Sequence, residues 1–111
     1  GNLGIGATAP TSLLHTSGSF AAGYRAITAL RTLDATDYTV NCTANSFTVT
    51  LPLSTSITGR IYNIKNTGTG TITIATTSGE LVDNYASGTL TLPQWTNLKV
   101  QSSGGGWIIL W

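Results

Sequence analysis

The stretch Asp37–Ala75 decides the fold of this chain. It reads Asp37-Tyr-Thr-Val-Asn-Cys-Thr-Ala-Asn-Ser-Phe-Thr-Val-Thr-Leu-Pro52, later Gly59-Arg-Ile-Tyr-Asn-Ile-Lys-Asn66, and then Thr71-Ile-Thr-Ile-Ala75. In Phe47–Leu51 apolar side chains alternate strictly with threonines, which is the period of a strand with one buried face. Pro52 cannot donate to a ladder and is expected to end that strand. The stretch therefore predicts a meander of short strands onto which the rest of the chain packs.

Similar patterns continue to the end of the chain, with turn residues between them. The expected strands are Tyr38–Cys42, Phe47–Leu51, Arg60–Lys65, Thr71–Ala75, Thr89–Leu92, Asn97–Gln101 and Trp107–Trp111, with a short piece at Leu81–Val82. The inward face is expected to carry Tyr38, Val40, Phe47, Val49, Leu51, Ile72 and Ile74. Short strands at regular spacing favour an all-β fold, here a small antiparallel sandwich of jelly-roll type, and no repeat of 20–50 residues is detectable.

Residues Ala21–Leu33 fit two structures. A spacing of three, typical of a short helix or 3₁₀ stretch, joins Tyr24, Ile27, Leu30 and Leu33. A spacing of two, typical of a strand, joins Arg25, Ile27, Ala29, Arg31 and Leu33. The threonines in this segment and the lack of a helix cap before Ala21 favour the strand.

Composition indicates one domain with an unusually uncharged surface. The chain has 111 residues, of which 41% are hydrophobic and 8% charged, against a usual charged fraction of roughly 25%. Such a surface is normally rich in Ser, Thr, Asn and Gly, hidden in an oligomer, or both. The net charge of +1 with scattered cations predicts no nucleic-acid partner, and no apolar run approaches the ~20 residues of a membrane span. Because the chain starts at Gly1 and contains no Met, we expect it to be part of a longer protein.

Residues 1–20 differ from the rest of the chain. They are rich in small residues, and Leu3, Ile5, Leu13 and Leu14 are spread without helical period. Ordering each backbone residue costs ~1–2 kcal/mol, and an apolar side chain returns ~1.5–3 kcal/mol only when fully buried. The segment is therefore expected to be either flexible or buried against other subunits. We expect an extended arm over residues 1–32 and a head domain over residues 33–111.

Catalytic and metal-binding patterns are weak. Gly4-Ile-Gly-Ala-Thr-Ala9 matches a dinucleotide-binding pattern, but no strand precedes it and Pro10 stands where a helix should run. His15 is the only histidine, and no nucleophile elbow surrounds a nearby serine. Glu80 and Asp83 could pair as in a glycosidase only by accident, since their loop position is typical of solvated turn residues. The single cysteine, Cys42, is expected to be a small buried hydrophobe. The sequence thus predicts no enzyme, no cofactor and no metal.

Aromatic residues provide the one candidate ligand site. Trp107 and Trp111 alternate with aliphatic residues and are expected to pack in the core or at a subunit interface. Tyr85, after Asn84, and Trp95, in Pro93-Gln-Trp-Thr-Asn97, lie in polar loops. Exposed aromatic rings beside amides form platforms for sugars, so Tyr85, Trp95 and Asn84 are the predicted glycan-binding residues.

The segment Gly1-Asn-Leu-Gly-Ile-Gly-Ala-Thr-Ala-Pro-Thr-Ser-Leu-Leu-His-Thr-Ser-Gly-Ser resembles a shaft motif of bacteriophage tail fibres, roughly G-N-V-G-I-G-T-T-x-P-x-x-x-L-H-V-x-G-x. Ala7 replaces the usual Thr and Thr16 the usual Val, whereas His15 falls on the histidine of the motif. The remainder resembles a β-rich module of phage head and tail fibres, through Asp37-Tyr-Thr-Val, Thr48-Val-Thr-Leu-Pro, Gly59-Arg-Ile-Tyr-Asn-Ile-Lys-Asn, Thr71-Ile-Thr-Ile and Gly106-Trp-Ile-Ile.

This resemblance implies a homotrimeric virion appendage without catalytic residues. Its expected roles are attachment to a host-surface glycan or protein, or decoration of the capsid, with other virion proteins contacted through the N-terminal side. The expected location is the virion surface, as a head or tail fibre. The alternative is a carbohydrate-binding module of a secreted bacterial protein, with Tyr85 and Trp95 as its platforms.

Overall fold

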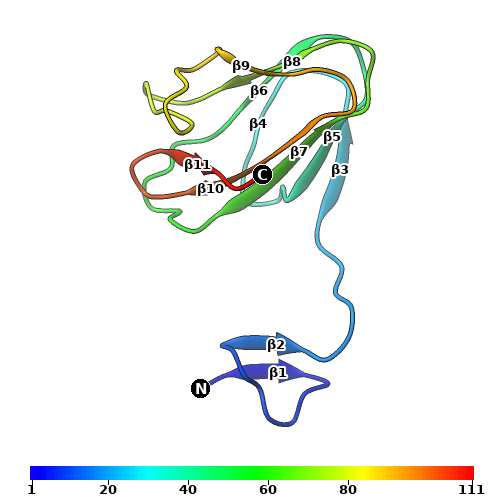
Figure 1. Cartoon of the computed structure of the whole chain (residues 1–111), viewed down its shortest axis with the longest axis vertical. Coiled ribbons are helices and arrows are strands. Elements are labelled where there is room, and N and C mark those ends of the chain that lie inside the picture. Colours follow the sequence, from blue (N-terminus) through cyan, green and yellow to red (C-terminus); the bar gives the residue numbers. More distant parts are fainter.

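The computed structural model describes all residues, Gly1–Trp111, and contains eleven β-strands and no helix, which confirms the all-β class. Two larger sheets form one body, and a small two-stranded sheet lies apart from them at the N-terminal end (Figure 1). No helix that could cross a membrane is therefore found.

The five-stranded sheet has the order β11-β10-β7-β5-β3, and the four-stranded sheet has the order β4-β6-β8-β9. The strands of the first are β3 Tyr24–Ile27, β5 Thr39–Cys42, β7 Ile61–Asn66, β10 Asn97–Ser102 and β11 Trp107–Ile109. Those of the second are β4 Arg31–Thr32, β6 Phe47–Thr50, β8 Ile72–Ala75 and β9 Leu90–Leu92.

From β3 to β8 the chain winds as a coil, because each strand lies in the opposite sheet from the strand before it. β3, β5 and β7 pair in parallel, as do β4, β6 and β8. Antiparallel pairing is confined to β8–β9, β7–β10 and β10–β11. The predicted antiparallel jelly-roll arrangement is therefore wrong for the first six strands of the body.

Two glycines allow successive corners of the coil to stack. A Cβ on Gly68 would lie 2.0 Å from the carbonyl oxygen of Ala44, and one on Gly70 would lie 2.3 Å from the nitrogen of Ser46. Only a residue without a side chain permits this approach of one connection to another. The turns differ in length, since Tyr24 pairs with Thr39 and Thr39 with Asn63, so the sequence carries no regular repeat.

The core lies between the two sheets and follows the alternation of the strands. Val40 and Cys42 of β5 point into it, as do Ile72 and Ile74 of β8. The buried members are Leu33, Val40, Cys42, Val49, Leu51, Tyr62, Ile64, Ile72, Ile74, Val82, Leu92, Leu98, Val100 and Trp107. Five of the seven predicted inward residues are in this set, and Tyr38 and Phe47 are only partly buried.

The structure refines the predicted boundaries. The strand interpretation of residues 21–33 is confirmed by β3 and β4, which both belong to the large sheets, although residues up to 32 were predicted as part of the arm. Leu81–Val82 forms no strand; Val82 makes only isolated bridges to Tyr85 and Trp107. The last strand ends at Ile109 instead of Trp111.

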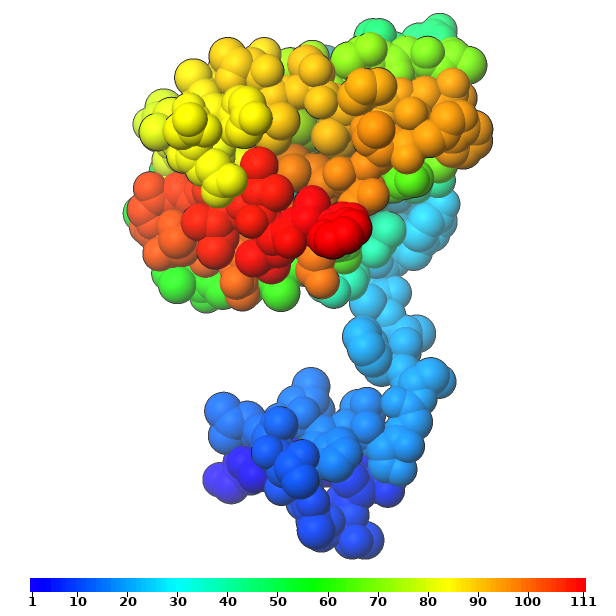
Figure 2. Space-filling view, in the orientation of Figure 1, coloured from blue at the N-terminus to red at the C-terminus, as the bar shows by residue number.

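The N-terminal segment forms its own parallel pair, β1 Leu3–Ile5 and β2 Leu14–Thr16. No residue of this segment belongs to the core cluster of the body. In the space-filling view it is a separate lobe joined to the body by a thin stretch of chain (Figure 2). The body thus has a complete core without residues 1–20.

Candidate functional site

The three predicted glycan-binding residues do not form one platform. Asn84 and Tyr85 lie in a turn that starts at Val82, which bridges to Trp107. Trp107 pairs with Ser102, the residue after Gln101, and Gln101 pairs with the first residue of β7. Trp95 lies in the turn between β9 and β10, and its N–H donates to the carbonyl of Asn66, the last residue of β7. Tyr85 and Trp95 are therefore at opposite ends of the five-stranded sheet, and only Asn84 and Tyr85 are brought together.

Trp95 has an unusual backbone for an exposed aromatic residue. The residue is 66% exposed, and its φ of 71° lies in the left-handed region. Bulky residues rarely occupy this region, where the strain costs of order 1–3 kcal/mol. The turn is held by hydrogen bonds to both backbone groups of Trp95, from its N–H to Asn66 (2.6 Å) and from Lys65 Nζ to its carbonyl (2.9 Å). The ring gains little from the core, so packing does not explain this conformation.

Asn66 anchors this end of the sheet from inside. Its side chain is fully buried. The amide nitrogen donates to the carbonyls of Gly70 (2.8 Å) and Leu92 (2.9 Å), and the amide oxygen accepts the N–H of Gly68 (3.0 Å). One side chain thus joins the β7–β8 corner to the end of β9, next to the Trp95 turn. The sequence does not reveal this role, because an asparagine at a strand end is also a common turn residue.

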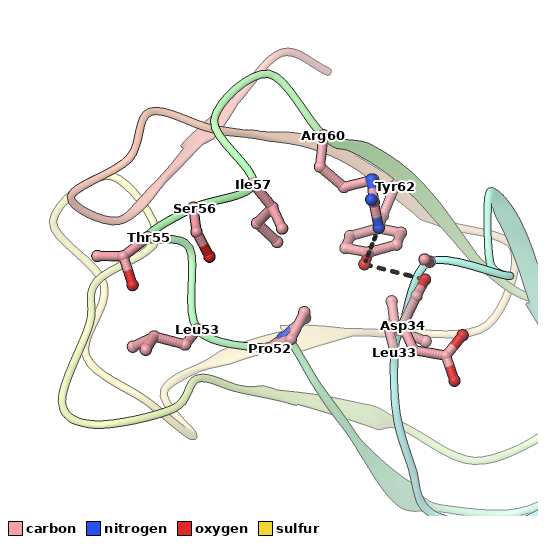
Figure 3. A pocket seen from close by; sticks show the side chains of 10 residues that line it. Leu33, Asp34, Pro52, Leu53, Thr55, Ser56, Ile57, Arg60 and Tyr62 are labelled. Atoms are coloured by element: carbon pink, nitrogen blue, oxygen red, sulfur yellow. Dashed lines mark hydrogen bonds between the residues drawn. The ribbon is translucent and has the colours of Figure 1, made fainter.

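A cleft of about 320 Å³ opens where β4 and β6 end and β7 begins (Figure 3). Its floor is apolar, with Leu33, Pro52 and Ile57, and Arg60 lies at its edge. Arg60 Nη1 donates to the hydroxyl of Tyr62 (3.3 Å), which donates to the carbonyl of Asp34 (3.1 Å). Burial raises the pKa of the Tyr62 phenol, which therefore stays neutral.

Asp34 is the single carboxylate of the cleft. Hydrogen bonds from the side chain and backbone of Thr36 hold the pKa of Asp34 below its ordinary value, and nearby Arg31 lowers it further. An ionised carboxylate cannot donate a proton as a general acid near neutral pH. The cleft thus offers a cation and an apolar floor but lacks an acid–base pair.

The remaining carboxylates are engaged in structural hydrogen bonds. Glu80 accepts from the backbone N–H (2.9 Å) and the hydroxyl (2.5 Å) of Ser54, and Asp83 accepts from the N–H of Ile109 (3.0 Å). The two side chains that could have paired as in a glycosidase are therefore bound to different segments. No group of three or more His, Cys, Asp or Glu side chains that could hold a metal ion is present.

Asp37 joins the two sheets through two arginines. Its carboxylate is inaccessible to solvent and accepts from Arg25 of β3 (2.8 Å) and Arg31 of β4 (2.9 and 3.1 Å), and from the N–H of Asp34 (2.9 Å). In the sequence, only the spacing of two that includes Arg25 and Arg31 indicated that both arginines lie on one side of the chain. Asp37 and the two arginines therefore form a structural clamp between the two sheets.

The contacts of His15 and Cys42 indicate structural roles for both residues. The Nδ1 atom of His15 accepts the N–H of Thr11 (3.2 Å) within the N-terminal segment. Cys42 is buried in the core, as predicted, and burial raises the pKa of its thiol to about 11. A protonated, enclosed thiol is a poor nucleophile.

Apolar side chains gather on the surface of the N-terminal segment. Leu3, Ile5, Leu13, Leu14 and Phe20 are 58–78% exposed. A hollow of about 350 Å³ lies among Ile5, Leu14, Thr16 and Phe20. The name arm patch is used below for the five apolar residues Leu3, Ile5, Leu13, Leu14 and Phe20. Trp111, expected to pack, is also 78% exposed in the single chain, whereas Trp107 is buried against Tyr62 with ring centroids 5.6 Å apart.

Comparison with protein-family models, with curated proteins and with solved structures returned no match.

Proposed function

We propose that this chain is a non-enzymatic domain of a virion appendage, a head or tail fibre of a bacteriophage. It assembles as a homotrimer and serves in attachment to the host surface or in decoration of the capsid. The arm patch is the observation that carries this proposal.

The arm patch cannot be satisfied within one chain. A two-stranded sheet is at best marginally stable in water, and β1–β2 contributes no residue to a core. Each of the five exposed apolar side chains of the arm patch would contribute ~1.5–3 kcal/mol to the stability of the assembly if a neighbouring subunit covered it. Such burial offsets the cost of ordering the segment. The number three comes from the resemblance of residues 1–19 to the trimeric fibre shaft.

In this proposal each subunit is a small β-sandwich with an N-terminal arm that crosses its two neighbours. The glycines and alanines of the arm allow three chains to approach a common axis. The N-terminal side leads towards other virion proteins, and the body faces outward. The low charge of the chain suits a domain that hides much of its surface in an assembly.

Native mass spectrometry at micromolar concentration tests the assembly. We expect a trimer for residues 1–111, and a monomer both for residues 21–111, which retain the whole core, and for the Leu14→Asp variant. Leu81→Asp, a matched change at an exposed leucine of the body, should stay trimeric. A monomeric 1–111 chain would overturn the proposal.

A second candidate is a carbohydrate-binding module of a secreted bacterial protein. The exposed, left-handed Trp95 favours it, because such a residue is explained by a ligand better than by packing. A glycan array separates the two: binding that Trp95→Ala abolishes, by a chain that is monomeric, supports the module. A silent array with a trimeric chain supports the purely structural role.

A further inference from the structure

The outer face of the five-stranded sheet carries a regular polar surface. Residues of β7 and β10 that alternate with the buried ones point away from the core. Lys65 pairs with Asn97 across the two strands, and Asn63 pairs with Lys99. We call these four residues the lysine face. Lys65 and Lys99 are diagonal neighbours, so their Cβ atoms are roughly 7–8 Å apart.

The lysine face is positively charged and uncompensated. Lys65 and Lys99 are the only lysines of the chain, and neither forms an ion pair. No carboxylate lies among the outward residues of β5, β7 and β10, which are Thr39, Asn41, Ile61, Asn63, Lys65, Asn97, Lys99 and Gln101. A ligand with negative charge is therefore complementary to this surface.

The face also has free hydrogen-bonding capacity. The side chains of Asn63, Asn97 and Lys99 form no hydrogen bond within the chain, and Lys65 uses one donor for the carbonyl of Trp95. An amide offers two donors and one acceptor oxygen, which suits the hydroxyl groups of a sugar. Because Lys65 Nζ donates to the backbone carbonyl of Trp95, the turn that carries this exposed aromatic residue lies at the end of the polar face.

We propose that the lysine face, with Trp95 at its end, binds an anionic glycan. The two ammonium groups pair with a carboxylate or phosphate of the glycan, the asparagines bind hydroxyl groups, and the indole of Trp95 packs against a sugar ring. The strain in the Trp95 backbone is retained because it keeps the ring at the edge of the face.

A second copy of this chain is a poor occupant of the lysine face. Its charge complement would have to come from Asp34, Asp37, Glu80 or Asp83. All four carboxylates already accept hydrogen bonds within their own subunit, and that of Asp37 is inaccessible. An anion from outside the chain is therefore the better occupant of this face.

The inference deepens the attachment role proposed above, but it does not depend on the trimer. The test uses an array with sialylated, uronic-acid and phosphorylated glycans, each beside its neutral parent, probed with the full chain and with Leu14→Asp. We expect binding to at least one acidic class and at least tenfold weaker binding to its neutral parent. The class that binds distinguishes carboxylate from phosphate.

Variants then locate the site by titration calorimetry. Lys65→Met with Lys99→Met should weaken binding about tenfold, as should Trp95→Ala, whereas Lys65→Arg with Lys99→Arg should bind within about threefold of the original chain. Tyr85→Ala is the aromatic control at the opposite end of the sheet and should bind normally. Raising the salt from 0.1 to 1 M shortens the Debye length from ~10 to ~3 Å and should weaken binding.

Three results would overturn the inference. One is equal binding of acidic glycans and their neutral parents, including no binding to either. Another is equally tight binding of a DNA duplex, which would show a general polyanion surface. The third is a change of oligomeric state in the lysine-to-methionine variant, which would place a second copy on the face. A monomeric chain that binds acidic glycans would refute the trimer and leave this inference standing.

Discussion

Asn66→Ala tests whether one buried side chain holds the end of the body together. The substitution removes three hydrogen bonds, of 2.8, 2.9 and 3.0 Å, to two backbone groups of the β7–β8 connection and one at the end of β9. Alanine cannot replace any of them. Because Asn66 is fully buried, water cannot readily take over its role at the carbonyl of Leu92 or the N–H of Gly68.

The expected loss follows from these contacts. A hydrogen bond contributes a net ~0.5–1.5 kcal/mol, and a buried group left without a partner costs about 1–3 kcal/mol. Three such bonds give a loss in the free energy of unfolding of about 3–5 kcal/mol. Domains of this size are stable by only about 5–15 kcal/mol. One kilocalorie shifts the melting temperature of a small domain by about 4–8 °C, so we expect a decrease of at least about 12 °C.

Urea unfolding followed by tryptophan fluorescence measures this effect. The matched control is Asn63→Ala, the same change three residues earlier on β7, where the side chain points outward and forms no hydrogen bond. It should cost no more than about 0.5 kcal/mol. Equal losses at the two positions would show that the buried hydrogen bonds of Asn66 do not stabilise the corner, and the reasoning would fail.

Three further predictions concern the clamp between the sheets and the core. Asp37→Ala should lower the free energy of unfolding by about 2–3 kcal/mol, because Arg25 and Arg31 lose their shared acceptor, and Asp34→Ala should have a much smaller effect in the same urea titration. Equal effects would contradict the clamp. At pH 8 Cys42 should not react with a disulfide reagent until the chain is unfolded. The pKa of its thiol is raised to about 11 in the folded state, so this contribution to stability is complete below the ordinary thiol pKa and is lost as the pH rises towards 11. Cys42→Ala should therefore lose less stability than the original chain over that pH range, and a parallel decline would contradict the assignment.

The strands and most of the core could be predicted from the sequence. Strict alternation in Phe47–Leu51 and the shared face of Tyr62 and Ile64 in Arg60–Lys65 placed β6 and β7 within one residue at each end. The buried faces follow the same alternation. These features are local, and the side-chain period of two is a property of each strand by itself.

The pairing of the strands could not be predicted in the same way. Period-two alternation is the same in parallel and antiparallel sheets. The connections between β3 and β4 and between β5 and β6 have only three and four residues, lengths that usually join hairpins. Here they cross to the other sheet, and the signal is the tight contact of Gly68 and Gly70 with the preceding corner. A glycine needed for contact between distant corners looks, in sequence, like any turn glycine.

The candidate site likewise depends on contacts between residues that are far apart in the sequence. Trp95 was identified as an exposed loop aromatic, and its exposure is confirmed, but its partners were not found. Lys65 and Asn97 are far apart in the sequence and meet only through the register of β7 with β10. Tyr85 was grouped with Trp95 by loop character alone. Strand β9 lies between them in the chain, and the two residues are at opposite ends of the five-stranded sheet.

The coil also separates the surface proposed for assembly from the surface proposed for ligand binding. Its last turns are covered by antiparallel strands, β9 in one sheet and β10–β11 in the other, whereas its first turn leaves β3 and β4 as edges. The connection between these edges carries Leu30, which is 77% exposed, and β3 continues directly into the segment that leads to the arm patch (Figure 1). Stacked architectures need a cap on such an open turn, and a neighbouring subunit can provide it. The lysine face lies two strands away from this edge, on β7 and β10. Subunits that meet at the first turn would therefore bury the apolar residues there and leave Lys65, Lys99 and Trp95 free for a ligand.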